Sequence, residues 1–157
     1  MQQKYILIKK PVLDSLCKKR YPLGRQSTRA LCEATFGTRE VLDMAILVSG
    51  GAGYIGSHTC IELLNAGYDV VVADNYYNAS PVVLDRVKQI TGKDFRFYQA
   101  DMTKHEDVEK IFAECPDITA VIQFAAYKAV GESVSKPIEY YYNNLNCTLV
   151  ILDVMRK

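Results

Sequence analysis

Three glycines in one short run are the residues of this chain whose spacing points most directly to chemistry. Gly50, Gly53 and Gly56 form a G-x-x-G-x-x-G pattern. The pattern lies between an apolar run at 45–49 and an amphipathic stretch at 54–66. A tight turn from a strand into a helix needs residues without a Cβ atom, and it lets a pyrophosphate approach the backbone and the free N–H groups of the helix N-terminus. The pattern therefore predicts a dinucleotide-binding turn.

An acidic residue supplies the second part of such a site. Asp74 closes the next apolar run, 18 positions beyond Gly56. A carboxylate at that place accepts hydrogen bonds from both hydroxyls of an adenosine ribose and repels a 2′-phosphate, which selects NAD over NADP. An aspartate that only caps a turn is the alternative. Asn75 and Asn78 follow, and their amides either bind the ribose and its phosphates or hold the turn.

Two further strand ends carry candidate binding residues. Asp101 can accept from an adenine amine while the backbone N–H of Met102 donates to a ring nitrogen, but Asp101 can equally cap the following helix. The segment 124–128, Phe-Ala-Ala-Tyr-Lys, has small residues that let a backbone pass flat against a nicotinamide ribose. Lys128 either lies near the phosphates or is an ordinary exposed lysine.

A base for hydride chemistry is the part that the sequence does not supply. A Tyr-x-x-x-Lys pair on a helix places an ammonium beside a phenol and lowers the phenol pKa, so that the phenolate acts as a base. The only such pair is Tyr5 with Lys9, in a stretch expected to be strand or coil, where residues i and i+4 do not face one another. We interpret the pair as coincidental and expect no catalytic base in this chain.

Alternating strand and helix patterns position these residues. From Met44 onward we expect strands at 45–49, 69–74, 95–99 and 120–124, and helices at 54–66, 80–90, 104–114 and 138–156. Ser80 is the expected cap of the second helix, with Pro81 at its first position. Nearly continuous apolar strands indicate a parallel sheet covered on both faces, and right-handed crossovers favour the strand order 3-2-1-4. The fold class is thus α/β, a Rossmann-like doubly wound parallel sheet that ends after about four β-α units, with its fourth strand as an unprotected edge.

Residues 1–43 lack this regularity. They carry nine Lys and Arg against four Asp and Glu, whereas residues 44–157 carry ten against fourteen. Residues 5–8 are a candidate strand and residues 11–20 a candidate helical turn, and no signal-peptide core is present. We interpret 1–43 as a leader of unknown role, dispensable for the fold, with upstream read-through before Met44 as the favoured origin. Residues 44–157 are then a partial NAD-binding Rossmann domain.

Composition excludes several functions. The mildly acidic residues 44–157 give no reason to expect nucleic-acid binding, and no run of 18 apolar residues predicts a membrane span. The five cysteines and two histidines show no metal-ligand spacing, so no metal site is expected. Free thiols in a reducing compartment favour a cytoplasmic location.

These residues resemble the N-terminal part of the UDP-glucose 4-epimerases, a family of extended short-chain dehydrogenases/reductases. The resemblance covers Met44 to Lys157 and is carried by the glycine motif, Asp74-Asn75, 124–133, Lys136-Pro137 and 140–144. The run Lys-Ala-Val-Gly-Glu-Ser that begins at Lys128 is far more particular to the epimerases than the glycine motif. Three departures stand out, with Ser49 where Thr is usual, Gln123 where His is usual and Cys147 where Gly is usual.

The resemblance implies an isomerase that uses NAD to interconvert UDP-glucose and UDP-galactose in galactose metabolism. The cofactor contacts that follow from the residues and the resemblance are Gly50, Gly53, Tyr54, Ile55, Gly56, Asp74, Asn75, Asn78, Ser80, Asp101, Met102, Phe124, Ala125, Ala126, Tyr127, Lys128 and Asn143. The family's Ser/Thr and Tyr-x-x-x-Lys catalytic residues and its sugar-binding domain would lie beyond Lys157. We therefore expect residues 1–157 to be a cofactor-binding fragment without turnover.

Alternatives remain open at this point. Another extended nucleotide-sugar dehydratase or epimerase is one, and a non-catalytic NAD-binding module is another. A UDP-sugar is the expected substrate of the full-length protein, and a homodimer is open for that protein. No nucleic-acid or membrane partner is expected.

Overall fold

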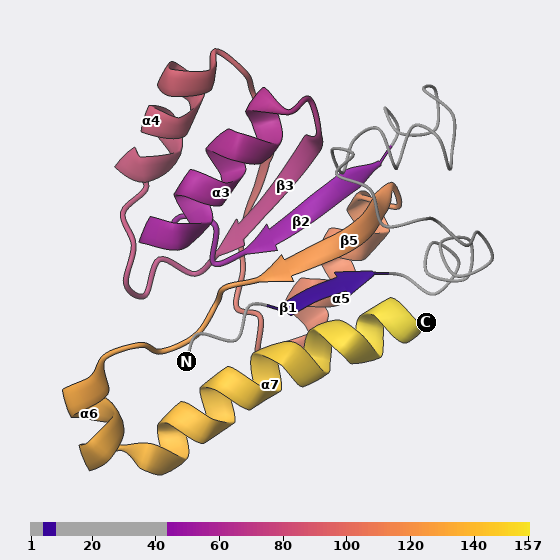
Figure 1. The fold of residues 1–157 in the computed structure, drawn as a ribbon. Helices are drawn as coiled ribbons and strands as arrows, with labels where there is room; N and C mark the ends of the chain where they lie inside the picture. The colour runs from indigo at the N-terminus through magenta and orange to yellow at the C-terminus, as the bar shows by residue number, and fades with distance from the viewer. Residues whose placement is uncertain (1–4, 9–43) are drawn as a thin grey trace, which may run out of the picture.

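The computed structural model describes residues 5–8 and 44–157, which form a five-stranded sheet between two helical layers (Figure 1). The strands are β1 (Tyr5–Ile8), β2 (Ala45–Ser49), β3 (Asp69–Asp74), β4 (Arg96–Gln99) and β5 (Ile118–Gln123). The helices are α3 (Tyr54–Asn65), α4 (Val82–Thr91), α5 (His105–Glu114), α6 (Val130–Ser135) and α7 (Pro137–Arg156). Each strand and helix expected after Met44 is present, with its ends shifted by a few residues at most.

The order of the sheet is β1-β5-β2-β3-β4. β2 pairs in parallel with β3 on one side and with β5 on the other, and β3 pairs in parallel with β4. Counted from β2, this is the predicted order 3-2-1-4, so the doubly wound parallel sheet is confirmed. The chain leaves β2 in one direction across the sheet and later returns to its other side, which creates a switch point at the carboxyl ends of β2 and β5.

The free edge expected on β5 is not there. β1 pairs with β5 in the antiparallel direction, from Tyr5 opposite Gln123 to Ile8 opposite Ala120. The expectation was wrong because an edge strand offers unpaired N–H and C=O groups that any extended segment can satisfy, and hydrophobic periodicity does not report such pairing. The strand predicted at 5–8 is confirmed, while the helical turn predicted at 11–20 lies outside the described residues.

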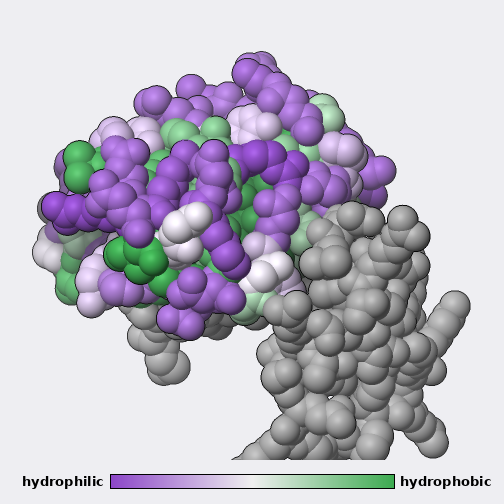
Figure 2. Space-filling view, turned by 90° about the horizontal axis from the view of Figure 1, so that it is seen from above, coloured by the Kyte–Doolittle hydropathy of each residue, from purple (hydrophilic) through white to green (hydrophobic). Residues whose placement is uncertain are grey.

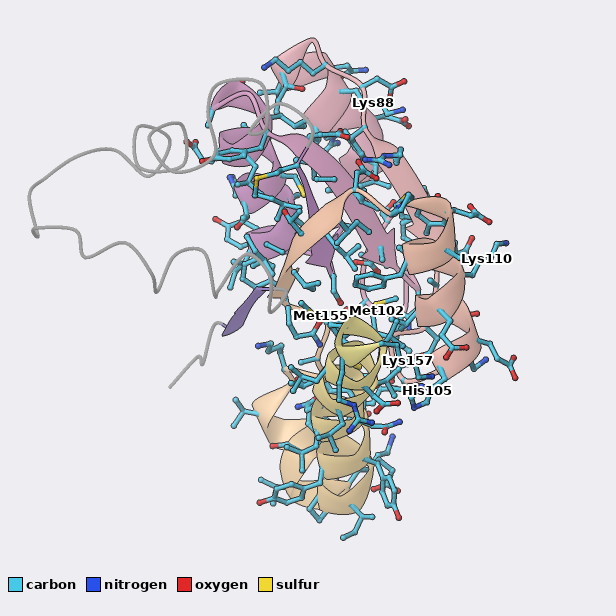
Figure 3. The ribbon with its side chains drawn as sticks, turned by 90° about the vertical axis from the view of Figure 1, so that its right-hand side faces the viewer. Lys88, Met102, His105, Lys110, Met155 and Lys157 are labelled. Atoms are coloured by element: carbon cyan, nitrogen blue, oxygen red, sulfur yellow. The ribbon has the colours of Figure 1, made fainter. Side chains whose placement is uncertain are left out.

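Two cores lie on the two faces of the sheet. Alternate residues of β3 point to opposite faces, with Val70 and Val72 in the core under α3 and α4, and Val71 in the core under α5 and α7. Viewed from the side of α3 and α4, the surface is mostly hydrophilic with isolated hydrophobic residues (Figure 2). Figure 3 shows Lys157 at the end of α7 beside α5, and its Nζ lies 2.6 Å from a carboxylate oxygen of Glu109.

Two details of the helices differ from expectation. The N-cap of α4 is Pro81, without a side-chain hydrogen bond, so the predicted Ser80 cap is wrong. The carbonyl of Ser80 accepts the N–H of Val83 instead (3.0 Å), because a turn that is already helical at Pro81 can be satisfied by the backbone alone. α6 was not expected, since its six residues bury no side chain and carry no apolar period. No helix in the described part of the chain is long and apolar enough to cross a membrane.

Candidate functional site

A cavity of about 380 Å³ opens at the carboxyl ends of β2, β3, β4 and β5, at the switch point of the sheet. Ligands bind in crevices of this kind in doubly wound sheets. The lining residues are Gly50, Gly53, Tyr54, Ile55, Gly56, Asp74, Asn75, Tyr77, Asn78, Ala79, Ala100, Asp101, Met102, Phe124, Ala125, Ala126, Tyr127, Lys128, Asn143 and Cys147. All the binding residues expected from the sequence are among them except Ser80, which is exposed and does not line the cavity.

Close backbone contacts give the glycine turn (residues 50–53) its shape. Gly50 has a φ of +73°, and a Cβ atom there would lie 2.6 Å from the backbone nitrogen of Ala125. A Cβ atom on Gly56 would overlap the carbonyl oxygen of Gly50 and lie 2.7 Å from the Cα atom of Gly51. Gly50 is therefore required because its φ is positive and because the chain after β5 approaches it closely. Gly56 is required because α3 packs closely on the turn.

The start of α3 is open towards a ligand. Its N-cap is Gly53, and no side chain among the described residues makes a cap hydrogen bond there. Tyr54 and Ile55, at the first positions of the helix, line the cavity. Free N–H groups and the helix dipole make such an end an anion site, so phosphate oxygens fit here.

Asp74 joins the end of β3 to the glycine turn. Its side chain is buried, with Oδ2 accepting the N–H of Ala52 (3.0 Å) and Oδ1 accepting the N–H of Tyr76 (2.8 Å). The alternative that Asp74 caps a turn is therefore correct, but it does not exclude a contact with a ligand. Each carboxylate oxygen has a further lone pair, and Asp74 also lines the cavity, so it can still accept from a ribose diol.

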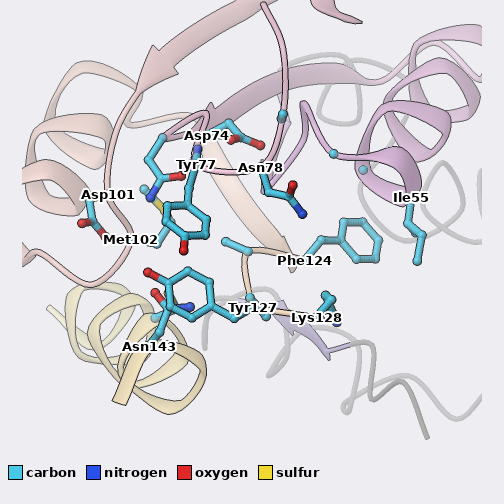
Figure 4. A pocket seen from close by; sticks show the side chains of 18 of the residues that line it. Ile55, Asp74, Tyr77, Asn78, Asp101, Met102, Phe124, Tyr127, Lys128 and Asn143 are labelled. Carbon is cyan, nitrogen blue, oxygen red and sulfur yellow. Dashed lines mark hydrogen bonds between the residues drawn. The ribbon is translucent and has the colours of Figure 1, made fainter. Parts of the chain in front are cut away.

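The loop from β3 to α4 adds one expected contact and one unexpected one. Oδ1 of Asn75 accepts the N–H of Tyr77 (2.9 Å), so this side chain holds the turn, and both Asn75 and Asn78 line the cavity. Tyr77 was not expected from the sequence. Its ring centroid lies 4.7 Å from that of Tyr127, which comes from the opposite wall (Figure 4). Only the fold shows that these two tyrosines face each other.

Asp101 and Met102 form the wall beyond β4. The N-cap of α5 is Lys104, so the helix-cap alternative for Asp101 is wrong. Its Oδ1 accepts instead from the N–H of Thr103 (2.9 Å) and from the Thr103 hydroxyl (2.7 Å), because the loop bends before the helix begins. Asp101 and the buried Met102 both line the cavity.

The β5 exit loop (residues 124–129) forms the remaining wall. The N–H of Phe124 donates to the carbonyl of Ser49 (2.8 Å), and Nε2 of Gln123 donates to the carbonyl of Ala125 (2.9 Å). These bonds hold the loop against Gly50. Lys128 is exposed on this wall and lies towards Phe124 and Ile55 in Figure 4, whereas Asn143 lies on the side of Met102 and Asp101.

Burial favours the neutral forms of the Tyr127 phenol and the Cys147 thiol. Desolvation, with smaller contributions from Tyr77 and other neighbours, raises the pKa of Tyr127. Burial also raises the pKa of the Cys147 thiol to about 12, with Asp101 as a second cause. Cys147 was noted only as a departure from the family pattern. Its spacing of four residues from Asn143 on one helix could have placed it on the same wall.

The residues of the cavity are better suited to binding an extended dinucleotide than to catalysing a reaction. It combines a glycine cradle that Cβ atoms would fill, a carboxylate, two aromatic rings and a flat stretch of small residues. No group of His, Cys, Asp or Glu in the described part of the chain could hold a metal ion. Of the Tyr5 and Lys9 pair, Tyr5 lies in β1 and Lys9 lies outside the described residues. The cavity thus has the groups that bind and orient a dinucleotide.

Comparison with known proteins gives the same family throughout. A family model described as "NAD dependent epimerase/dehydratase family" matches residues 46–157. The UDP-glucose 4-epimerase of Bacillus subtilis is 60% identical over 114 residues, which cover 73% of this chain and 33% of that protein. The crystal structure of UDP-glucose 4-epimerase from Bifidobacterium longum in complex with NAD+ and UDP has a TM-score of 0.68 and 57% identity, and it covers 72% of this chain and 33% of that one. The UDP-Glc/GlcNAc 4-epimerase of Campylobacter jejuni has a TM-score of 0.65 and 32% identity, covering 71% and 33%. The chain spans about a third of the length of these relatives.

Proposed function

The chain belongs to the NAD dependent epimerase/dehydratase family, and from this premise we propose that its cavity binds NAD in a protein that interconverts UDP-glucose and UDP-galactose. The observation that carries the proposal is the meeting of the glycine turn and Asp74 in one cavity, where Asp74 hydrogen-bonds to Ala52. The UDP-glucose 4-epimerases among the relatives, and the NAD+ and UDP in the complex from Bifidobacterium longum, support both the cofactor and the substrate.

The residues of the cavity divide the cofactor among them. The start of α3 would take the pyrophosphate, Asp74 the adenosine ribose, and Asp101 with Met102 the adenine. The β5 exit loop would line the nicotinamide half, with Lys128 as a cation near the phosphates. Asn143 would reach this half from α7, on the side of Met102 and Asp101. NAD, when bound, supplies a hydride acceptor that can return the hydride to the sugar. The chain's own part is to hold the nicotinamide against the β5 exit loop and to exclude NADP through the charge of Asp74.

The described residues that line the cavity hold no Tyr-x-x-x-Lys pair on a helix, the arrangement that would supply a phenolate base. Tyr127 lines the cavity, but burial raises the pKa of its phenol, which is the opposite of what a phenolate base needs. We therefore place the base and the sugar-binding surface in parts of the protein outside residues 44–157. The chain's length, about a third of its relatives, is consistent with that.

Two measurements test the proposal. Calorimetric titration of residues 1–157 with NAD should show one saturable site, and NADP should bind more weakly. Conversion of UDP-galactose to UDP-glucose should be seen with the protein of the complete reading frame and not with residues 1–157. NAD binding without conversion by the complete protein would leave a binding module and overturn the epimerase. Conversion by residues 1–157 within tenfold of the complete protein would overturn the assignment of the base.

A second copy of the protein is the partner that α7 favours. Six large hydrophobic side chains are exposed on α7, and their spacing of three and four residues places them along one side of the helix. They are Ile138, Tyr141, Tyr142, Leu145, Leu149 and Leu152. An exposed apolar row of this length is typical of a protein interface. We propose a homodimer of the complete protein, which light scattering after gel filtration would test. A monomer at all concentrations would contradict it.

The buried free thiols of the described cysteines also support a cytoplasmic location.

A further inference from the structure

One side chain of α7 holds the β5 exit loop by both of its polar atoms. Oδ1 of Asn144 accepts the N–H of Tyr127 (2.7 Å), and Nδ2 of Asn144 donates to the carbonyl of Tyr127 (3.1 Å). This is the pair of bonds that a neighbouring strand gives to one residue of a sheet. A primary amide is suited to the task because it carries an acceptor and a donor at the same end of a short side chain.

The same amide also orients the residue before it. Nδ2 of Asn143 donates to Oδ1 of Asn144 (3.0 Å), and Asn143 lines the cavity. With its backbone held by Asn144, Tyr127 places its ring 4.7 Å from Tyr77 and 5.3 Å from Tyr140, measured between ring centroids. Figure 4 shows Tyr127 between Tyr77, Asn143 and Lys128. Asn144 itself does not line the cavity, so any effect that it has on a ligand passes through Tyr127 and Asn143.

A second asparagine on α7 holds the opposite end of the cavity. Nδ2 of Asn146 donates to the carbonyl of Thr103 (3.0 Å), which directly follows Asp101 and Met102. Asn144 and Asn146 are therefore two separate links from one helix to two loops. The first loop lines the proposed nicotinamide half and the second the proposed adenine half.

We propose that Asn144 is a positioning residue for the nicotinamide half of the cofactor, and that it acts independently of the adenine half, which Asn146 supports. The proposal rests on the function proposed above and refines it. The described hydrogen bonds of Asn144 to another loop both go to Tyr127 of the β5 exit loop, so removing its amide should release Tyr127 while Asp74 and Asp101 keep their hydrogen bonds.

The test compares two ligands on matched variants of the full chain. ADP carries the adenine, ribose and pyrophosphate only, whereas NAD also carries the nicotinamide riboside. Asn144→Ala should weaken NAD binding about tenfold and change the affinity for ADP by less than about twofold. These changes are expected when a pair of hydrogen bonds behind one half of the ligand is lost. Asn144→Asp keeps the shape and one acceptor but cannot donate to the Tyr127 carbonyl, so its NAD affinity should lie between those of Asn144→Ala and the parent. Asn146→Ala, the matched control, should weaken ADP and NAD by the same factor.

A spectroscopic signal separates positioning from general loosening. The fluorescence of bound NADH arises from the reduced nicotinamide ring, so it should change in the Asn144 variants and stay as in the parent in Asn146→Ala. Equal losses of ADP and NAD affinity in both Asn144 variants would overturn the proposal, as would unchanged NAD affinity in a folded Asn144→Ala. If Asn144→Ala does not fold, the isosteric Asn144→Asp gives the same decision. A parent chain that binds neither ligand would overturn the proposed function itself, which distinguishes the two failures.

Discussion

The glycine turn and the β5 exit loop are two walls of one cavity, and they are held in place by different kinds of contact. The turn is maintained mainly by backbone bonds, with the N–H of Gly50 donating to the carbonyl of Ala73 (2.7 Å) and the N–H of Gly53 donating to the carbonyl of Gly50 (3.2 Å). The side chain of Asp74 adds one bond, from the N–H of Ala52 (3.0 Å). The β5 exit loop has one such backbone bond, from Phe124 to Ser49 (2.8 Å), and otherwise depends on side-chain amides, from Gln123 within the strand and from Asn144 on a distant helix. The first wall therefore tolerates no added atom at its tightest points, whereas the second depends on single replaceable groups.

The difference has a consequence for how each wall responds to mutation. A backbone-on-backbone contact cannot relax without moving two chain segments, so a single methyl group there has a large cost. A lost side-chain hydrogen bond costs less, about 1 kcal/mol when water can replace it. Mutations in the glycine turn should therefore have larger effects than the loss of single side-chain hydrogen bonds.

The largest effect is expected from Gly56→Ala. The added methyl group would overlap the carbonyl oxygen of Gly50, so α3 and the turn must move apart. We expect roughly 30-fold weaker NAD binding, about 2 kcal/mol, measured by calorimetry. Gly131→Ala in α6 is the matched control, because a Cβ atom there meets nothing within 4 Å and alanine favours a helix. NAD affinity within threefold of the parent in Gly56→Ala would show that the turn is softer than its contacts indicate.

Asp74→Ala should change cofactor choice. The charge that opposes the 2′-phosphate is removed, and the N–H groups of Ala52 and Tyr76 lose their acceptor. We expect about tenfold weaker NAD binding, a smaller difference between the affinities for NAD and NADP, and a lower midpoint of thermal unfolding. Asp74→Asn keeps an acceptor without the charge, so it should narrow the gap with a smaller loss of stability. Equal affinities for NAD and NADP in the unmodified chain would contradict the role given to Asp74.

Deletion of residues 1–43 should have a moderate effect on stability. The sequence suggested that they are dispensable, but β1 pairs along β5, the strand that leads into the exit loop. Exposing that edge should lower the unfolding midpoint by about 2–5 °C and increase aggregation, while the two cores formed by the described residues between 45 and 154 keep the fold. An unchanged midpoint would show that the pairing contributes nothing, and complete unfolding would show that 44–157 is not a domain by itself.

The smallest effect is expected at Glu132, which ties α6 to α7. Its carboxylate accepts from Nζ of Lys136 (2.9 Å) and from the hydroxyl of Tyr140 (2.8 Å), and both bonds lower the pKa of Glu132 below its ordinary value of 4.5. A carboxyl with a lowered pKa stabilises the fold above its unfolded pKa, and this contribution is lost as the pH falls through the folded pKa. The unfolding midpoint of Glu132→Gln should therefore lie slightly below that of the parent near neutral pH.

Acid provides the control for that measurement. Below the lowered pKa the parent carries a neutral carboxylic acid, which resembles the amide of glutamine, so the two unfolding midpoints should converge. If the difference between the two unfolding midpoints is as large in acid as near neutral pH, the charge of Glu132 does not help to hold α6. It would then not help to hold the end of the β5 exit loop that leads into α6.

The two walls also differ in how far the sequence predicted them. Gly50, Gly56 and Asp74 follow from spacing, because a strand, a tight turn and a helix that are consecutive in the chain bring them together with little help from the rest of the molecule. Asn144 and Tyr77 could not be found in this way. Asn144 is 17 residues from Tyr127, and its role depends on where α7 crosses the end of the sheet.

The sequence alone determined what is local or periodic in this protein. Apolar runs with strand and helix periods gave the β-α units, the crossover rule gave the order of the parallel strands, and the glycine and aspartate spacing located the cavity. The tertiary structure decided the contacts between segments that no period links. These are the pairing of β1 on β5, the bend that makes Lys104 rather than Asp101 the cap of α5, and the amide of Asn144 that holds Tyr127. Their physical reason is the same, since an unpaired backbone group or loop is satisfied by whichever neighbour the fold brings to it.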